Sequence, residues 1–107
     1  MAVTVEERDG ALVVVPHGDL DIASAGRVRE MVQRARGDRD ALVIDLRGVS
    51  FLDTSGLRLL LEEHERAVAN GGRVSFVRGP RAVQRIFEVA GLADKLPFVD
   101  DPGEALA

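Results

Sequence analysis

The chain has 107 residues, of which 46% are apolar and 30% charged, and its net charge is −4. This is the size and composition of one domain that buries a modest core without covalent cross-links. The sequence has no cysteine, which excludes a disulfide framework, a thiol nucleophile and thiolate metal sites.

The bulk sequence also argues against nucleic acid and membranes as partners. No basic stripe interleaved with aromatic residues is present, as a nucleic-acid-binding surface would need. The N-terminus has no basic segment followed by an apolar run, and the longest apolar runs are far shorter than a membrane span. We therefore expect a soluble cytoplasmic protein without a signal peptide.

Two strands are expected to open the fold, at residues 4–7 and 11–17. They flank Asp9-Gly10, a pair typical of tight hairpin turns. The segment Gly18-Asp19-Leu20-Asp21 is then expected to break the second strand.

An amphipathic helix is predicted over residues 24–36, where apolar residues recur at helical spacing with charged residues between them. Ser24 is its expected N-cap, and Gly37 its stop. The apolar run at residues 41–46 indicates a buried strand, because apolar and polar residues hardly alternate along it.

A second helix is predicted over residues 55–69, ended by Asn70-Gly71-Gly72 as a left-handed cap would end it. Its expected core face consists of Leu57, Leu60, Leu61, His64 and Val68. Its expected solvated face consists of Glu62, Glu63, Glu65 and Arg66, with Glu62 and Arg66 at the spacing of a favourable ion pair.

The last third of the chain is expected to hold a strand at residues 74–77 and a third helix that begins at Gly79-Pro80 and stops at Gly91. A short strand at residues 97–99 follows, and residues 102–107 can form only a brief final helix. Strands thus alternate with helices, which predicts a single α/β domain over residues 1–107. Its sheet is expected to be mixed, mostly parallel, with about four to five strands covered by amphipathic helices.

The segment Asp53-Thr54-Ser55-Gly56 places two hydroxyls and a carboxylate at the start of the second helix. Free N–H groups and the helix dipole favour an anion there, and a phosphorylated hydroxyl would add nearly two negative charges for another protein to read. Taken alone, the segment is better explained as a simple helix cap, because such caps are common. Asp53 is expected to cap the helix, to orient the serine hydroxyl, or to do both.

Two motifs and the order of elements resemble the STAS domain family, specifically the bacterial anti-sigma factor antagonists. Gly18-Asp19-Leu20-Asp21 is similar to that family's Gly-x-Leu-Asp turn. Phe51-Leu52-Asp53-Thr54-Ser55-Gly56-Leu57 is similar to its phosphorylation loop. The resemblance covers essentially the whole chain, and the loop is its specific part.

The resemblance implies a STAS-like fold and a switch. In such proteins the unphosphorylated form binds an anti-sigma factor serine kinase and frees the sigma factor. Phosphorylation of the second hydroxyl of the loop releases the antagonist, and a serine phosphatase resets it. The implied acceptor is Ser55, with Thr54 as the secondary candidate. The resemblance further implies a monomer when free, with no catalytic residue, cofactor or metal of its own.

The residues expected to contact the partner surround this loop and the preceding turn. They are Asp19, Asp21, Asp53, Thr54, Ser55, Gly56 and Arg58. Gly56 is expected to let the kinase approach the backbone, and Gly18 to permit a tight turn. Arg58 places a bulky cation where smaller residues often occur in the family, which can bias the choice of partner.

Other interpretations stay open at this point. The same fold serves as a scaffold subunit of signalling assemblies and as an accessory subunit of lipid-transport complexes. An enzyme with Ser55 as nucleophile is disfavoured, because the Gly-x-Ser-x-Gly elbow is missing. Asp19 and Asp21 alone are too few ligands for a metal. The remaining polar residues are expected to pack or to face solvent: His17, His64, Arg78, Arg81 and Arg85.

Overall fold

The computed structural model describes residues 1–37, 39 and 41–106. The described residues form a six-stranded sheet and four helices. The elements in chain order are β1 (Ala2–Arg8), β2 (Ala11–Leu20), α1 (Ala25–Arg36), β3 (Ala41–Asp45), β4 (Val49–Leu52), α2 (Thr54–Ala69), β5 (Arg73–Val77), α3 (Arg81–Val89), β6 (Phe98–Val99) and α4 (Pro102–Leu106).

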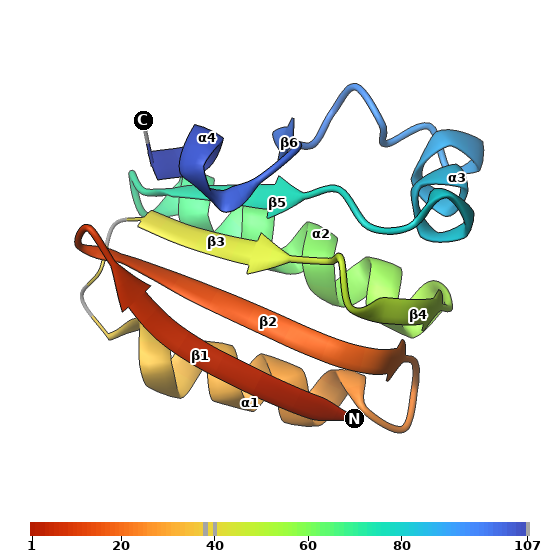
Figure 1. Cartoon of the computed structure of the whole chain (residues 1–107), viewed down its shortest axis with the longest axis horizontal. Helices are drawn as coiled ribbons and strands as arrows, with labels where there is room; N and C mark the ends of the chain where they lie inside the picture. Colours follow the sequence, from red (N-terminus) through yellow and green to blue (C-terminus); the bar gives the residue numbers. More distant parts are fainter. Residues whose placement is uncertain (38, 40, 107) are drawn as a thin grey trace.

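The sheet is mixed and mostly parallel, as predicted. Its strands lie in the order β1-β2-β3-β5-β6, and β4 pairs with β2 outside this path (Figure 1). Among the described residues, the β1–β2 hairpin is antiparallel, whereas the other four strand pairs are parallel. The predicted α/β class is confirmed. The final helix ends at Leu106, and Ala107 lies outside the described residues.

Two expectations about the strands were wrong. The segment from Gly18 to Leu20 does not break β2, because Gly18 adopts a φ of 103° and the pairing register shifts beside it. Only glycine adopts such a φ without strain, so β2 bends at this bulge and continues. The second error is an omission: no strand was predicted from the sequence at β4 (Val49–Leu52). This strand exists because the extended end of β2 offers it a partner.

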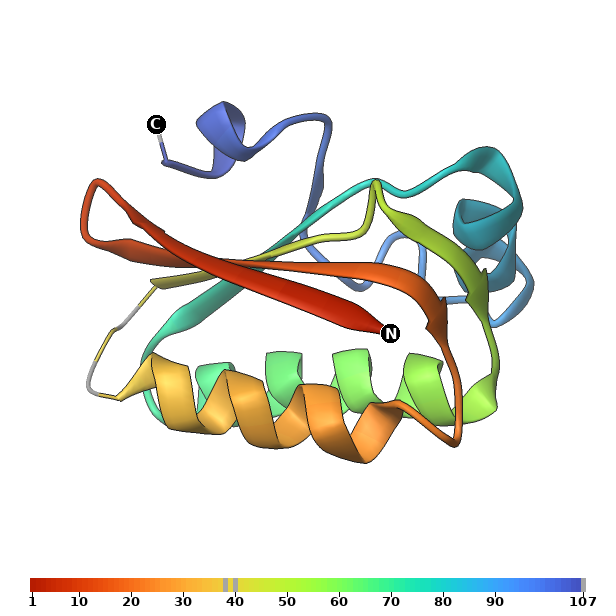
Figure 2. The same cartoon turned by 60° about the horizontal axis from the view of Figure 1, so that its bottom comes forward.

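The main core lies between the sheet and the helices on one of its faces. Figure 2 shows α1 and α2 on that face of the sheet and α4 on the opposite one. Alternate residues of the inner strands point into this core, among them Leu12, Val14, Leu42, Ile44 and Phe76. Burial of each such side chain stabilises the fold by about 1.5–3 kcal/mol.

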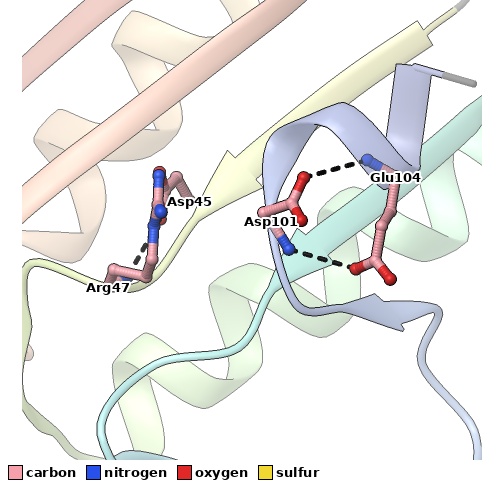
Figure 3. A network of polar contacts seen from close by, with 4 residues as sticks. All are labelled: Asp45, Arg47, Asp101 and Glu104. Atoms are coloured by element: carbon pink, nitrogen blue, oxygen red, sulfur yellow. Dashed lines mark hydrogen bonds and ion pairs between the residues drawn. The ribbon is translucent and has the colours of Figure 1, made fainter.

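The opposite face carries a smaller cluster of Val13, Val43 and Val77, which is covered in part by α4. A capping box holds α4 at its start: Asp101 accepts from the Glu104 N–H at 3.2 Å, and Glu104 accepts from the Asp101 N–H at 3.1 Å (Figure 3).

The last residue of β3, Asp45, has a buried carboxylate. The Asp45 side chain accepts hydrogen bonds from the Arg47 guanidinium at 2.8–3.2 Å and from the Arg47 backbone N–H (Figure 3). Burial by itself raises the pKa of Asp45, but the hydrogen bonds and charge of Arg47 outweigh burial and hold the pKa below its ordinary value.

The face of α2 that packs against the core is rotated from the predicted face by about one residue of the helix. The buried residues of α2 are Gly56, Leu59, Leu60, Glu63 and Ala67, whereas Val68 is 62% exposed. Apolar residues surround much of this helix, so their spacing alone does not fix its orientation.

Glu63, expected to be solvated, is therefore fully buried. Its Oε1 accepts from Arg66 at 3.0 Å, and its Oε2 has no hydrogen-bond partner among the described residues. Burial raises the pKa of the Glu63 carboxyl. Glu62 pairs with Arg29 on α1 at 2.7 Å, so the predicted Glu62–Arg66 pair does not form.

Both edges of the sheet are protected against pairing with another chain. The outer strand β1 ends in Glu6, Glu7 and Arg8, which are exposed, and the strand at the other edge, β6, has two residues. Charged and very short edge strands disfavour edge-to-edge association. Within residues 1–37, 39 and 41–106, no helix is long and apolar enough to cross a membrane.

Candidate functional site

The segment Asp53-Thr54-Ser55-Gly56 lies where the carboxyl ends of the parallel strands β2 and β4 meet. The loop from β2 to α1 and the start of α2 leave the sheet side by side at this edge (Figure 1). Ligand and partner sites of parallel sheets are commonly built at such strand ends. Helix α2 begins at Thr54, so Ser55 lies in its first turn.

Asp53 joins the two motifs. Its Oδ1 accepts from the backbone N–H groups of Ser55 at 2.8 Å and Gly56 at 3.0 Å, which caps the helix. Its Oδ2 accepts from the backbone N–H of Ile22 at 3.1 Å, across the gap to the β2–α1 loop. The capping role is confirmed, whereas no bond between Asp53 and the Ser55 hydroxyl occurs among the contacts of the described residues.

The β2–α1 loop is held by its own side chains. Asp21 Oδ1 accepts from the N–H groups of Ala23 at 3.0 Å and Ser24 at 3.2 Å. The Ser24 hydroxyl donates to the Asp19 carbonyl at 2.8 Å and accepts from the Asp21 N–H at 3.0 Å. Ser24 occupies the N-cap position as predicted, but its side chain makes no capping bond. The loop fold thus depends on both Asp21 and Ser24.

Gly56 faces the core instead of the solvent. A Cβ atom there would lie 2.3 Å from the Leu20 carbonyl oxygen and 2.6 Å from Leu52 Cδ1. Such contacts are far inside van der Waals distance, so α2 can approach β2 and β4 this closely only with glycine at position 56. The structure thus gives a packing reason for Gly56, which differs from the expected approach of a kinase.

Exposed side chains lie around the segment Asp53-Thr54-Ser55-Gly56. Ile22 is 81% exposed and Phe51 is 51% exposed, and Phe51 pairs with the exposed Asp19 across β4 and β2. We call the following set the docking edge: Asp19, Ile22, Phe51, Thr54, Ser55 and Arg58. Large apolar side chains that stay exposed beside a polar rim are typical of protein-binding surfaces.

Thr54 and Ser55 also line a surface pocket of about 360 Å³ with Arg29 and Arg58. Ile22, Ala25 and Gly26 complete its wall. Arg29 had not been singled out in the sequence, because α1 and α2 must pack together before it meets a loop 26 residues away. No local signal in the sequence marks it.

Of the predicted contact residues, Thr54, Ser55 and Arg58 share one pocket, whereas Asp19 and Asp21 line a second one with Met1 and Arg27. The Asp53 side chain links the two segments through its bond to the Ile22 N–H, and Gly56 is buried. Other residues considered from the sequence lie elsewhere. Arg81 and Arg85 line a separate pocket on α3. His64 Nδ1 is buried and has no hydrogen-bond partner among the described residues. The same residues contain no cluster of three His, Asp or Glu side chains that could hold a metal.

A family model, a related sequence and a solved structure all relate this chain to the same kind of protein. The sequence model of the STAS domain matches residues 2–105. The anti-sigma-F factor antagonist RsfA of Mycobacterium tuberculosis is 30% identical over 107 residues, covering 97% of this chain and 84% of that protein. A crystal structure of an anti-sigma factor antagonist from Mycobacterium paratuberculosis superposes with a TM-score of 0.88 at 29% identity, covering 98% and 90% of the two chains.

The same domain also occurs inside a transporter. The low affinity sulfate transporter 3 of Stylosanthes hamata is 31% identical over 110 residues, which is 90% of this chain but 17% of that protein.

Proposed function

The chain belongs to the STAS domain family, and on that premise we propose that it is an anti-sigma factor antagonist switched by phosphorylation of Ser55. The unphosphorylated form binds an anti-sigma serine kinase through the docking edge and thereby frees a sigma factor. The phosphorylated form dissociates, and a serine phosphatase restores it. This role places the protein in the cytoplasm.

The observation that carries the proposal is the position of the acceptor. Ser55 lies in the first turn of a capped helix and shares a pocket with the exposed Ile22. Phe51, also exposed, pairs with Asp19 on the neighbouring strand. Ser55 is partly exposed, so a kinase can reach its hydroxyl, while the apolar residues supply the contact area of a complex.

The chemical step needs only a hydroxyl from this chain. The Ser55 oxygen bonds to the γ-phosphorus of ATP, the bond from that phosphorus to the β–γ bridging oxygen breaks, and ADP leaves. The hydroxyl proton passes to a base of the kinase. The proposal therefore assigns no catalytic residue and no cofactor to the antagonist itself.

The added charge acts mainly on the complex and little on the fold. A phosphate at an exposed helix N-terminus is favoured by about 0.3–1 kcal/mol, so the domain stays folded. In a complex that buries Ser55, the dianion must lose its water beside the carboxylate of Asp53. Burying an unpaired charge costs several kcal/mol, and about 3 kcal/mol already weakens binding roughly a hundredfold.

The free protein is expected to be a monomer. The charged end of β1 and the two-residue β6 leave little for a second copy to pair with. The kinase then meets one docking edge on each antagonist. Light scattering of the purified chain tests this expectation.

The function is tested by incubating the chain with ATP, magnesium and each candidate anti-sigma kinase, followed by mass spectrometry of the intact protein and its tryptic peptides. One phosphate on Ser55, retained in Thr54→Val and lost in Ser55→Ala, is expected. Calorimetric titration should then show that the phosphorylated chain and a Ser55→Asp variant bind the kinase at least tenfold more weakly.

The contrary outcomes distinguish the alternatives. Binding without modification by any kinase refutes the switch and favours a scaffold subunit. Stable co-purification with transport proteins favours an accessory role, the context in which the domain occurs in the sulfate transporter. Phosphorylation that leaves kinase affinity unchanged refutes the proposed consequence of the modification.

A further inference from the structure

We propose that Arg29 and Arg58 form an internal receptor for the phosphate of phosphorylated Ser55. This inference rests on the proposed function, because it assumes that Ser55 is the residue modified. It assigns to the two arginines a role in holding the released state of the antagonist.

The pocket beside the acceptor carries the proposal. Arg29 and Arg58 line the same pocket of about 360 Å³ as Thr54 and Ser55. Arg58 follows Ser55 by three residues on α2, a spacing that places both side chains on one side of the helix. Long side chains on helices lean toward the N-terminus, so the Arg58 guanidinium reaches back toward the first turn.

Arg29 approaches the pocket from the neighbouring helix. It extends from α1, and its guanidinium donates to Glu62 of α2 at 2.7 Å. Both side chains of this pair are partly solvated, at 34% and 45% exposed, so the pair is weak and exchangeable. Arg58 makes no salt bridge within the part of the chain that the structure describes. One guanidinium is thus free and the other only lightly held.

The charges of the groups involved favour a change of partner for Arg29 after phosphorylation, from Glu62 to the phosphate. A phosphoserine carries nearly two negative charges and three acceptor oxygens, whereas Glu62 offers one charge. Guanidinium groups bind phosphate with paired N–H donors. Asp53, whose carboxylate caps the same turn, repels the phosphate, and the two arginines offset that repulsion. Arg29 accordingly leaves Glu62 for the phosphate, and Arg58 closes on it from the side of α2.

The exchange has a regulatory consequence. A phosphate held between two arginines is shielded from the solvent and from a phosphatase that must reach its phosphorus atom. The same movement leaves Glu62 without its partner on the exposed surface between α1 and α2. The phosphorylated antagonist therefore persists longer than one in which the phosphate projects freely into water.

The test uses the full chain with phosphoserine inserted at position 55 during translation, so that no kinase is needed. Phosphorus NMR titration gives the pKa of the second phosphate ionisation, which is about 6 for a free phosphoserine. Two arginines in contact are expected to lower this pKa by about 0.5–1 unit. The double variant Arg29→Gln with Arg58→Gln should restore the ordinary value.

The matched control removes the same charge elsewhere. Arg34 pairs with Glu30 on the exposed side of α1, and Arg85 lines the pocket on α3, so Arg34→Gln with Arg85→Gln should leave the phosphate pKa lowered. Equal phosphate pKa values in the wild-type chain and both double variants overturn the receptor. Failure of every kinase to modify Ser55, with the NMR result intact, would instead count against the proposed function alone.

Discussion

Two glycines in first turns of helices provide a matched test of how α2 is positioned. Gly26 lies in α1 and Gly56 in α2. A Cβ atom at position 26 would meet nothing within 4 Å, whereas one at position 56 would lie 2.3 Å from the Leu20 carbonyl oxygen. Alanine is therefore expected to have opposite effects at the two positions.

The magnitudes follow from the two environments. At position 26 alanine removes the conformational cost of glycine and stabilises the fold by about 0.5–1 kcal/mol. At position 56 the same gain is outweighed by overpacking against backbone, which costs about 1–3 kcal/mol and sometimes more. We expect Gly56→Ala to destabilise the domain by about 2 kcal/mol. For a domain of this size that corresponds to a melting temperature lower by about 8–16 °C.

Thermal unfolding followed by circular dichroism, with the kinase affinity of each variant at 20 °C, measures both effects. Gly26→Ala should melt higher than the wild-type chain and Gly56→Ala lower. Because Gly56 follows the capping segment, Gly56→Ala should also weaken kinase binding. Equal melting temperatures for the two variants would refute the close approach of α2 to β2 as the reason for Gly56.

Three further substitutions test the polar contacts. Asp53→Ala removes the helix cap and should lower the free energy of unfolding by about 1–2 kcal/mol in urea titrations, with Asp53→Asn closer to wild type. Glu63→Gln should raise stability at pH 7.5 by about 1 kcal/mol, because burial disfavours the charged form of Glu63 and glutamine carries no charge. That gain should shrink as the pH falls toward 4.5, since the raised pKa lets folded Glu63 take up a proton first; a gain independent of pH would contradict this. Asp45→Asn removes the ion pair with Arg47 and should lower the free energy of unfolding at pH 7. The loss should be about 1 kcal/mol, because water screens the half-exposed Arg47 and weakens the pair. Since the folded pKa of Asp45 lies below its ordinary 3.8, the difference in melting temperature should disappear only as the pH falls below about that value.

Local signals in the sequence predicted most of the fold. The helix boundaries agree to within a few residues, because Gly37, Gly71 and Gly91 adopt positive φ angles at their ends. Strand β4 was missed because only its two end residues are buried, which produces neither alternation nor an apolar run. Its existence depends on pairing with β2, a contact over some 30 residues of sequence.

The site too was predicted only in part, because local sequence signals identify its motifs but not the residues that long-range contacts bring to it. The residues of its two motifs follow one another in the sequence, and the resemblance to a family identified them. Arg29 and Ile22 belong to neither motif nor a recognisable chemical pattern. Packing of α1 against α2 brings Arg29 to the site, and the bond from the Ile22 N–H to Asp53 brings Ile22 there. Glu63 was misplaced because Gly56 and Ala67, two small residues, determine which side of α2 faces the sheet.

The residues that determine the shape of the docking edge, such as Asp53 with its bond to the Ile22 N–H, differ from the residues whose side chains a partner would contact. The shape depends on hydrogen bonds from the side chains of Asp53, Asp21 and Ser24 to backbone groups, and on the buried Gly56. The side chains at positions 22, 51 and 58 are exposed and lie outside the core. Exchanging those side chains leaves folding intact. If the chain functions as proposed, a few substitutions at these surface positions can change which kinase it binds while the fold stays the same.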